Sequence, residues 1–123
     1  MAVWRKKYLE LFPDLPKDFQ EDGIYIALHE LVKKAKIAYD VSDNETLSRI
    51  FGFAEWCLKQ NTGELNNAAC VSFYEHLGEA TDKLVKFSPW ISPEALELAS
   101  GILKWAFSED DFLELKHAVE KKR

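Results

Sequence analysis

The sequence predicts an all-α protein: a single compact bundle of about six antiparallel helices, with HEAT-like stacking of helical hairpins as a variant of the same class. Apolar residues recur at helical spacing along nearly the whole chain, and no stretch shows the sustained alternation of a strand. Five glycines and four prolines are few, and most stand where helices are expected to end. The 123 residues are enough for one core, so we expect residues 1–123 to form one domain.

Three helices are predicted in the first half of the chain. The first covers about residues 3–12 and ends at Pro13, and a short turn is expected at residues 17–20. The second begins after Gly23, and the third opens with a capping box in which Ser42 and Glu45 satisfy backbone N–H groups. The inward-facing residues are Trp4, Tyr8, Leu11 and Phe12 on the first helix, Ile24, Ala27, Leu28, Leu31, Ala35 and Ala38 on the second, and Leu47, Ile50, Phe51, Ala54, Cys57 and Leu58 on the third.

The second half predicts three more helices. Residues 61–63 form a tight stop, a fourth helix is expected over about residues 64–82, and a loop holds residues 88–90. The third and fourth helices are apolar on more than one side, so we expect them in the middle of the bundle.

Capping signals mark the last two helices. Ser92 is expected to cap the fifth helix, which begins at Pro93, and Ser108 with Asp111 forms a weaker capping box before the sixth. The inward-facing residues are Ala95, Ala99, Ile102, Leu103 and Ala106 on the fifth helix and Phe112, Leu115 and Val119 on the sixth.

The net charge of −5 is concentrated in the centre of the chain. Residues 42–82 hold two basic and seven acidic residues, whereas both flanks are neutral. Nucleic acids and anionic membranes attract a clustered excess of Lys and Arg, so neither is an expected partner. The chain has no apolar run as long as a signal peptide or a membrane span, and Cys57 and Cys70 are interpreted as reduced, buried thiols. These observations predict a cytoplasmic protein.

The sequence holds no complete catalytic or metal-binding motif. His29 and Glu30 begin a zincin-like pattern, but Lys33 stands where a second histidine is required. Glu114 and His117 have the spacing of a di-iron motif, which needs a second copy that the chain does not contain. We therefore expect no enzyme, no cofactor and no metal.

The densest group of titratable residues is an acidic row in the predicted fourth helix. Glu75 and Glu79 stand four residues apart, where like charges on a helix repel each other, and a basic protein partner would relieve this repulsion. A proton-transfer site and a merely solvated face are the alternatives. Charge reversal at both residues is expected to weaken binding and leave stability nearly unchanged. The predicted partner-binding residues are Glu64, Glu75, Glu79 and Asp82, with Phe53 and Trp56 as apolar contacts.

Three short motifs resemble a family of small, uncharacterised, all-helical bacterial proteins. They are an L-F-P-x-L pattern at residues 11–15, an (I/L)-F-x-F-x-E pattern at residues 50–55 and an N-x-x-x-V-x-F-x-E-x-L pattern at residues 67–77. Such proteins are similar to immunity proteins, which bind and neutralise a bacterial toxin. The resemblance covers residues 11–82, implies an immunity-like role by analogy, and brings no catalytic residues with it.

Two other classes of function stay open beside a protein-binding module. One is a small enzyme or ligand-binding domain with a polar-lined pocket near one of the histidines. The other is a subunit whose second apolar faces drive self-association into a homo-oligomer.

Overall fold

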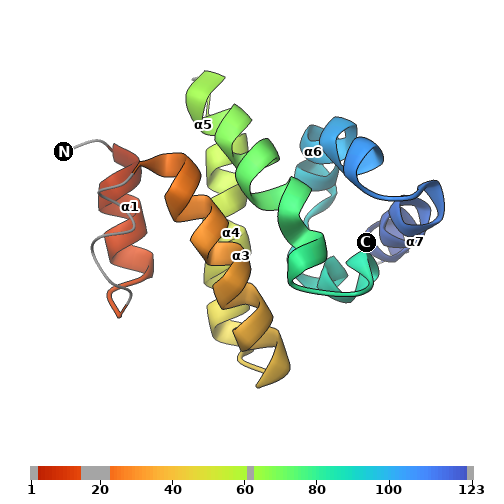
Figure 1. Ribbon diagram of the computed structural model, residues 1–123, viewed down its shortest axis with the longest axis horizontal. Helices are drawn as coiled ribbons and strands as arrows, with labels where there is room; N and C mark the ends of the chain where they lie inside the picture. The colour runs from red at the N-terminus through yellow and green to blue at the C-terminus, as the bar shows by residue number, and fades with distance from the viewer. Residues whose placement is uncertain (1–2, 15–22, 61–62, 122–123) are drawn as a thin grey trace.

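A computed structural model describes residues 3–14, 23–60 and 63–121, and every regular element in these residues is a helix, which confirms the all-α class (Figure 1). The expected turn at residues 17–20 and part of the stop at residues 61–63 lie outside the described residues. In chain order the elements are α1 (Val3–Leu11), α3 (Ile24–Asp40), α4 (Asn44–Leu58), α5 (Gly63–Ala68), the π-helical turn η1 (Ala69–Phe73), the 3₁₀ helices η2 (Tyr74–Glu79) and η3 (Leu84–Trp90), α6 (Pro93–Ala106) and α7 (Glu109–Lys121).

Helix α4 lies in the middle of the fold, as predicted. It pairs with α3 in an antiparallel hairpin and also contacts α1, α5, η1, η3 and α6. Figure 1 shows α1 at one end of the molecule and the α6–α7 pair at the other. The buried side chains form one connected cluster from Trp4 to Val119. No helix within the described ranges combines the length and the apolar character needed to cross a membrane.

The start of α4 differs from the prediction. Asp43, rather than Ser42, caps the helix, because its Oδ1 accepts a hydrogen bond from the backbone N–H of Thr46 at 3.1 Å. Ser42 has a φ of 59°, in the left-handed region, and helps to reverse the chain between α3 and α4. The tight connection therefore uses Ser42 for the turn and leaves the following carboxylate at the helix N-terminus, where negative charge is favourable.

The predicted fourth helix is also different: it is a composite of α5, η1 and η2 and ends at Glu79 instead of Asp82. The π turn contains the buried Ala69, Ser72 and Phe73 and packs against α3. Within it Phe73 meets the ring of Phe51 edge-on, with ring centroids 5.2 Å apart. The helix changes its winding where tertiary packing demands it, which periodicity along the sequence does not reveal.

Residues 84–90, part of which was predicted as a loop, form the 3₁₀ helix η3. Leu84 and Phe87 stand three residues apart, a spacing that eclipses side chains in a 3₁₀ helix, and both are buried. Trp90 continues the row and lies half-buried against Phe51 and Tyr39.

The predicted caps of the last two helices are confirmed. Ser92 Oγ accepts a hydrogen bond from the N–H of Ala95 at 3.0 Å, and Ser108 Oγ accepts one from the N–H of Asp111 at 3.1 Å. Pro93 occupies the first turn of α6, where its missing N–H has no intrahelical partner to lose.

Candidate functional site

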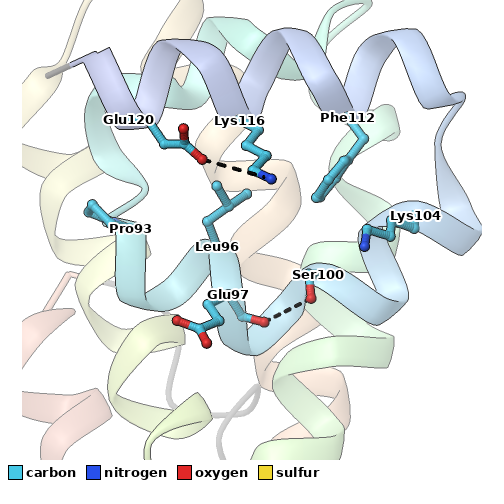
Figure 2. A pocket seen from close by; sticks show the side chains of 8 residues that line it. All are labelled: Pro93, Leu96, Glu97, Ser100, Lys104, Phe112, Lys116 and Glu120. Atoms are coloured by element: carbon cyan, nitrogen blue, oxygen red, sulfur yellow. Dashed lines mark hydrogen bonds and ion pairs between the residues drawn. The ribbon is translucent and has the colours of Figure 1, made fainter.

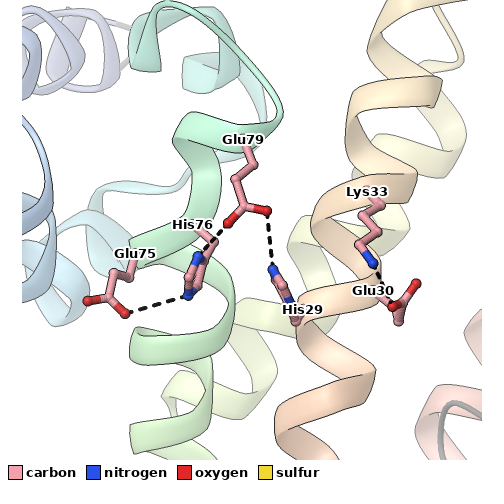
Figure 3. A network of polar contacts seen from close by, with 6 residues as sticks. All are labelled: His29, Glu30, Lys33, Glu75, His76 and Glu79. Atoms are coloured by element: carbon pink, nitrogen blue, oxygen red, sulfur yellow. Dashed lines mark hydrogen bonds and ion pairs between the residues drawn. The ribbon is translucent and has the colours of Figure 1, made fainter.

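Two histidines and a glutamate from different parts of the chain meet between α3 and η2 (Figure 3). His29 Nε2 lies 3.2 Å from Glu79 Oε1, and His76 Nδ1 lies 2.5 Å from Glu79 Oε2. The two imidazole rings are 4.7 Å apart, centroid to centroid. Each histidine side chain is 38% exposed and that of Glu79 is 49% exposed, so the cluster lies at the surface.

The 3₁₀ winding of η2 explains why His76 and Glu79 lie on the same side of this helix. They stand three residues apart, and a 3₁₀ helix has three residues per turn, so their side chains are eclipsed. Leu77, fully buried between them in sequence, fixes the segment on the core. On α3 the buried Leu28 does the same for its neighbour His29.

This arrangement corrects the predicted acidic face. Glu75 and Glu79 do not form a repelling pair on a continuous α-helix, because four residues of 3₁₀ helix turn them apart; Figure 3 shows them on opposite sides of His76. Desolvation raises the pKa of Glu79, but the hydrogen bonds from His76 and His29 outweigh it, so the pKa lies below its ordinary value. Asp82 pairs with Lys86 Nζ at 2.6 Å. Three of the four predicted carboxylates therefore have partners inside the molecule, and Glu64 is exposed on α5.

Phe53 is not a surface contact, which also corrects the prediction. Its side chain is 0% exposed, and it meets the rings of Tyr8 and Phe12 edge-on at 5.6 and 6.0 Å. Helix α1 folds over this second apolar side of α4 and buries it. Trp56 is half-buried: it stacks on Phe53, with centroids 6.1 Å apart, and Lys7 Nζ lies 5.5 Å from its ring centroid.

The most exposed aromatic side chain among the described residues lies elsewhere, on α6. Trp105 is 75% exposed, and Leu98, two turns earlier on the same side of the helix, is 45% exposed. The half-buried Ile102 lies between them, and Gly101 beside it is exposed, with open space where a Cβ would stand. We call the side formed by Leu98, Gly101, Ile102 and Trp105 the α6 outer face.

A groove of about 460 Å³ runs along the other flank of α6, between this helix and α7 (Figure 2). Its apolar lining residues are Pro93, Leu96 and Phe112, and polar or charged side chains complete the lining. Lys104 Nζ lies 5.4 Å from the Phe112 ring centroid, and Lys116 pairs with Glu120 at 3.9 Å. The charges of the groove are thus largely engaged with groups of the protein itself.

The two thiols are poor nucleophiles. Both cysteines are free; burial raises the pKa of Cys57 to about 12 and shifts that of the half-buried Cys70 upward. The thiolate is the reactive form of cysteine, so both side chains are protonated and inert near neutral pH. This agrees with their interpretation as structural thiols, with Cys70 less buried than expected.

The His29–His76–Glu79 cluster was not predicted from the sequence. The zincin and di-iron patterns place two ligands on one helix, whereas His29 and Glu79 are 50 residues apart in the chain. The one local signal was the density of titratable residues from Glu75 to Asp82. The exposure of Trp105 was not predicted either, because a large aromatic residue outside the inward stripe of a helix can still be covered by a neighbouring element.

These features define an all-helical domain with a His–Glu–His cluster between α3 and η2 and an exposed apolar row on α6. The chain belongs to the protein family described as Domain of unknown function (DUF7674), which matches residues 5–106. No curated protein and no solved structure matches the chain. The predicted membership of an uncharacterised family is confirmed, and nothing in the match names an immunity protein. Helix α7 follows the matched region.

Proposed function

We propose that this protein is a non-enzymatic protein-binding module that holds a basic partner on the α6 outer face. The observation that supports it is the exposure of Trp105: a tryptophan that leaves 75% of its surface in water contributes little to the core. Trp is the residue type most enriched among the energetically dominant contacts of protein interfaces. Leu98 and Ile102 extend the apolar surface by two helical turns, the length on which a partner helix makes its contacts.

The charge around this face indicates the chemistry of the partner. Residues 92–121 hold seven acidic residues and three lysines, and the basic Lys122 and Arg123 follow them in the sequence. The acidic residues nearest to Trp105 in the sequence lie at the start of α7. Glu109 and Asp110 are exposed and begin α7 directly after the Trp105 end of α6. A partner whose apolar residues are flanked by Lys or Arg would complement both the apolar row and these two exposed carboxylates.

In its finer form, the proposal is that the module neutralises its partner, as immunity proteins do. The support is the resemblance of residues 11–82 to proteins similar to immunity proteins, an analogy of sequence rather than of site. The first partner to test is the product of the neighbouring gene, because immunity proteins are encoded beside their toxins. Rescue of cell growth on co-expression of the two would support neutralisation.

The test compares partner capture by the wild-type protein and by two matched variants. Trp105→Ala removes the exposed aromatic of the α6 outer face, and Ile37→Ala removes a 58% exposed apolar side chain on α3. Trp105→Ala is expected to weaken binding by at least about tenfold, in the range of interface hot spots, while Ile37→Ala does not. Both should melt near the wild-type temperature.

Two outcomes would contradict the proposal. If Glu64→Lys and Asp82→Lys abolish capture and Trp105→Ala does not, the partner docks on the acidic residues of the central segment. If sedimentation shows a dimer that Trp105→Ala dissociates, the face joins two copies of this chain instead.

A further inference from the structure

We propose that His29, His76 and Glu79 form a binding site for a divalent transition-metal ion of the zinc class. One nitrogen from each histidine and one carboxylate oxygen of Glu79 lie within 4.8 Å of one another. Ligands around a zinc ion lie roughly 3 to 3.5 Å apart, as follows from metal–ligand distances of about 2.0–2.2 Å in a tetrahedron. His29 Nε2 lies 3.2 Å from Glu79 Oε1 and His76 Nδ1 lies 2.5 Å from Glu79 Oε2, both near or below that spacing. One ion would therefore be bound by both carboxylate oxygens, or by a single oxygen after a rotation of the Glu79 side chain.

The ring nitrogens that face Glu79 identify the donor atoms. They are Nε2 of His29 and Nδ1 of His76. A histidine that binds a metal through Nδ1 keeps its proton on Nε2, and a neighbouring carboxylate commonly accepts that proton in a hydrogen bond. Glu75 Oε2 lies 3.7 Å from His76 Nε2, on the side of the ring away from Glu79, where a slight rotation completes this contact. Glu75 is therefore the residue that would orient His76.

The backbone beneath these side chains is fixed by the core. His29 and His76 each adjoin a fully buried leucine, Leu28 and Leu77, and the elements that carry them pack on each other. The π turn η1 comes directly before η2, and π turns inside α-helices are frequent at functional sites, where they redirect side chains. Metal sites built on rigid helices hold their ligands more accurately than sites on loops.

The donor set selects the class of ion. Two imidazoles and one carboxylate suit zinc, cobalt, nickel or copper, whereas calcium and magnesium prefer oxygen ligands alone. Three protein ligands also leave a coordination position for water or an exogenous group. That position has access to solvent, because the two histidine side chains are each 38% exposed and that of Glu79 is 49% exposed.

The alternative is a hydrogen-bonded network in which Glu79 only accepts protons from the two rings. In that network hydrogen bonds alone hold the three side chains together, and an added metal ion would bind here no more tightly than elsewhere on the surface. The two interpretations differ in whether the protein binds zinc or cobalt with one-to-one stoichiometry through these residues.

The experiment uses the full chain, stripped of metal by a chelator and kept reduced, titrated with ZnCl₂ in a calorimeter and with CoCl₂ in a spectrophotometer. The variants are His29→Gln and His76→Gln, and the control is His117→Gln, which removes the exposed histidine of α7. We expect one ion per chain, a loss of affinity of at least about tenfold in the two cluster variants, and wild-type affinity in the control. MgCl₂ should not compete.

A second measurement needs no variant. Diethyl pyrocarbonate modifies accessible histidines, and mass spectrometry counts the products at each one. Zinc is expected to protect His29 and His76 and leave His117 reactive. Equal affinity in all variants, modification of His29 and His76 that zinc does not slow, or a thiolate-to-cobalt charge-transfer band, which would place the ion on a cysteine, would each overturn the proposal.

Discussion

Replacing Ser92 with alanine is expected to loosen the attachment of α6 to α4. Ser92 Oγ accepts a hydrogen bond from the N–H of Ala95 and donates one to Glu55 Oε1 at 2.6 Å. Loss of an N-cap costs about 1 kcal/mol. The hydrogen bond to the Glu55 carboxylate contributes about 1 kcal/mol, at the low end for a charged acceptor, because both groups are only partly buried. Together, the two losses should lower the free energy of unfolding by about 2 kcal/mol.

This loss translates into a melting temperature. An unfolding entropy of about 2.1 cal/mol/K per residue gives about 0.26 kcal/mol/K for 123 residues, so Ser92→Ala should lower Tm by about 8 °C. A double-mutant cycle with Glu55→Ala isolates the Ser92–Glu55 bond, because the loss of the cap is common to both backgrounds. The expected coupling energy from urea denaturation is about 1 kcal/mol. Additive effects within about 0.3 kcal/mol would show that the two side chains do not interact, and would refute this reasoning.

The same bond predicts a pH dependence. Partial burial raises the pKa of Glu55, but the hydrogen bonds from Ser92 and Lys59 and the positive charge of Lys59 outweigh it, so the pKa is lowered in the folded state. A lowered carboxyl pKa contributes stability that is complete above the unfolded value of about 4.3 and disappears as pH falls through the folded value. Between pH 7 and pH 3 the wild-type protein should therefore lose more stability than Glu55→Ala does.

Three further changes test other parts of the fold. Tyr8 Oη is buried and has no hydrogen-bond partner among the described residues, so Tyr8→Phe should raise the free energy of unfolding in urea by about 1 kcal/mol; a decrease would mean that the hydroxyl is bonded. Phe53→Ala should lower the free energy of unfolding by about 3–5 kcal/mol, the cost of a cavity in the core. A loss below about 1 kcal/mol would show that Phe53 is a surface residue. Glu79→Lys places a cation beside His29 and His76 and should cost about 0.5–1 kcal/mol, a surface-pair value, whereas the continuous-helix interpretation predicts no change in the thermal melt.

The sequence was informative wherever an element obeys simple α-helical geometry. The inward faces of α3, α4 and α7 and the caps at Ser92 and Ser108 follow from spacing and from local hydrogen bonding, so each could be predicted from neighbouring residues. The cap at Asp43 was missed because two consecutive residues, Ser42 and Asp43, are both good caps, and the choice depends on how sharply the chain turns.

The remaining differences have a common physical origin in tertiary packing. The burial of Phe53 depends on α1 folding over a second side of α4, and the separation of Glu75 from Glu79 depends on the change to 3₁₀ winding. The contact between His29 and Glu79 joins positions 50 residues apart. The spacing of apolar residues within one helix determines none of these three features. The candidate site can therefore be recognised only in the folded structure.

The π turn before η2 has a consequence for the relatives of this chain. Such a turn holds about one residue more than an α turn, so it absorbs an additional residue without changing the orientation of the helix that follows. A homologue that lacks one residue between Ala68 and Tyr74 and continues there as an α-helix would therefore still present His76 toward His29. We expect the length of this short stretch to vary across the family independently of the histidine pair.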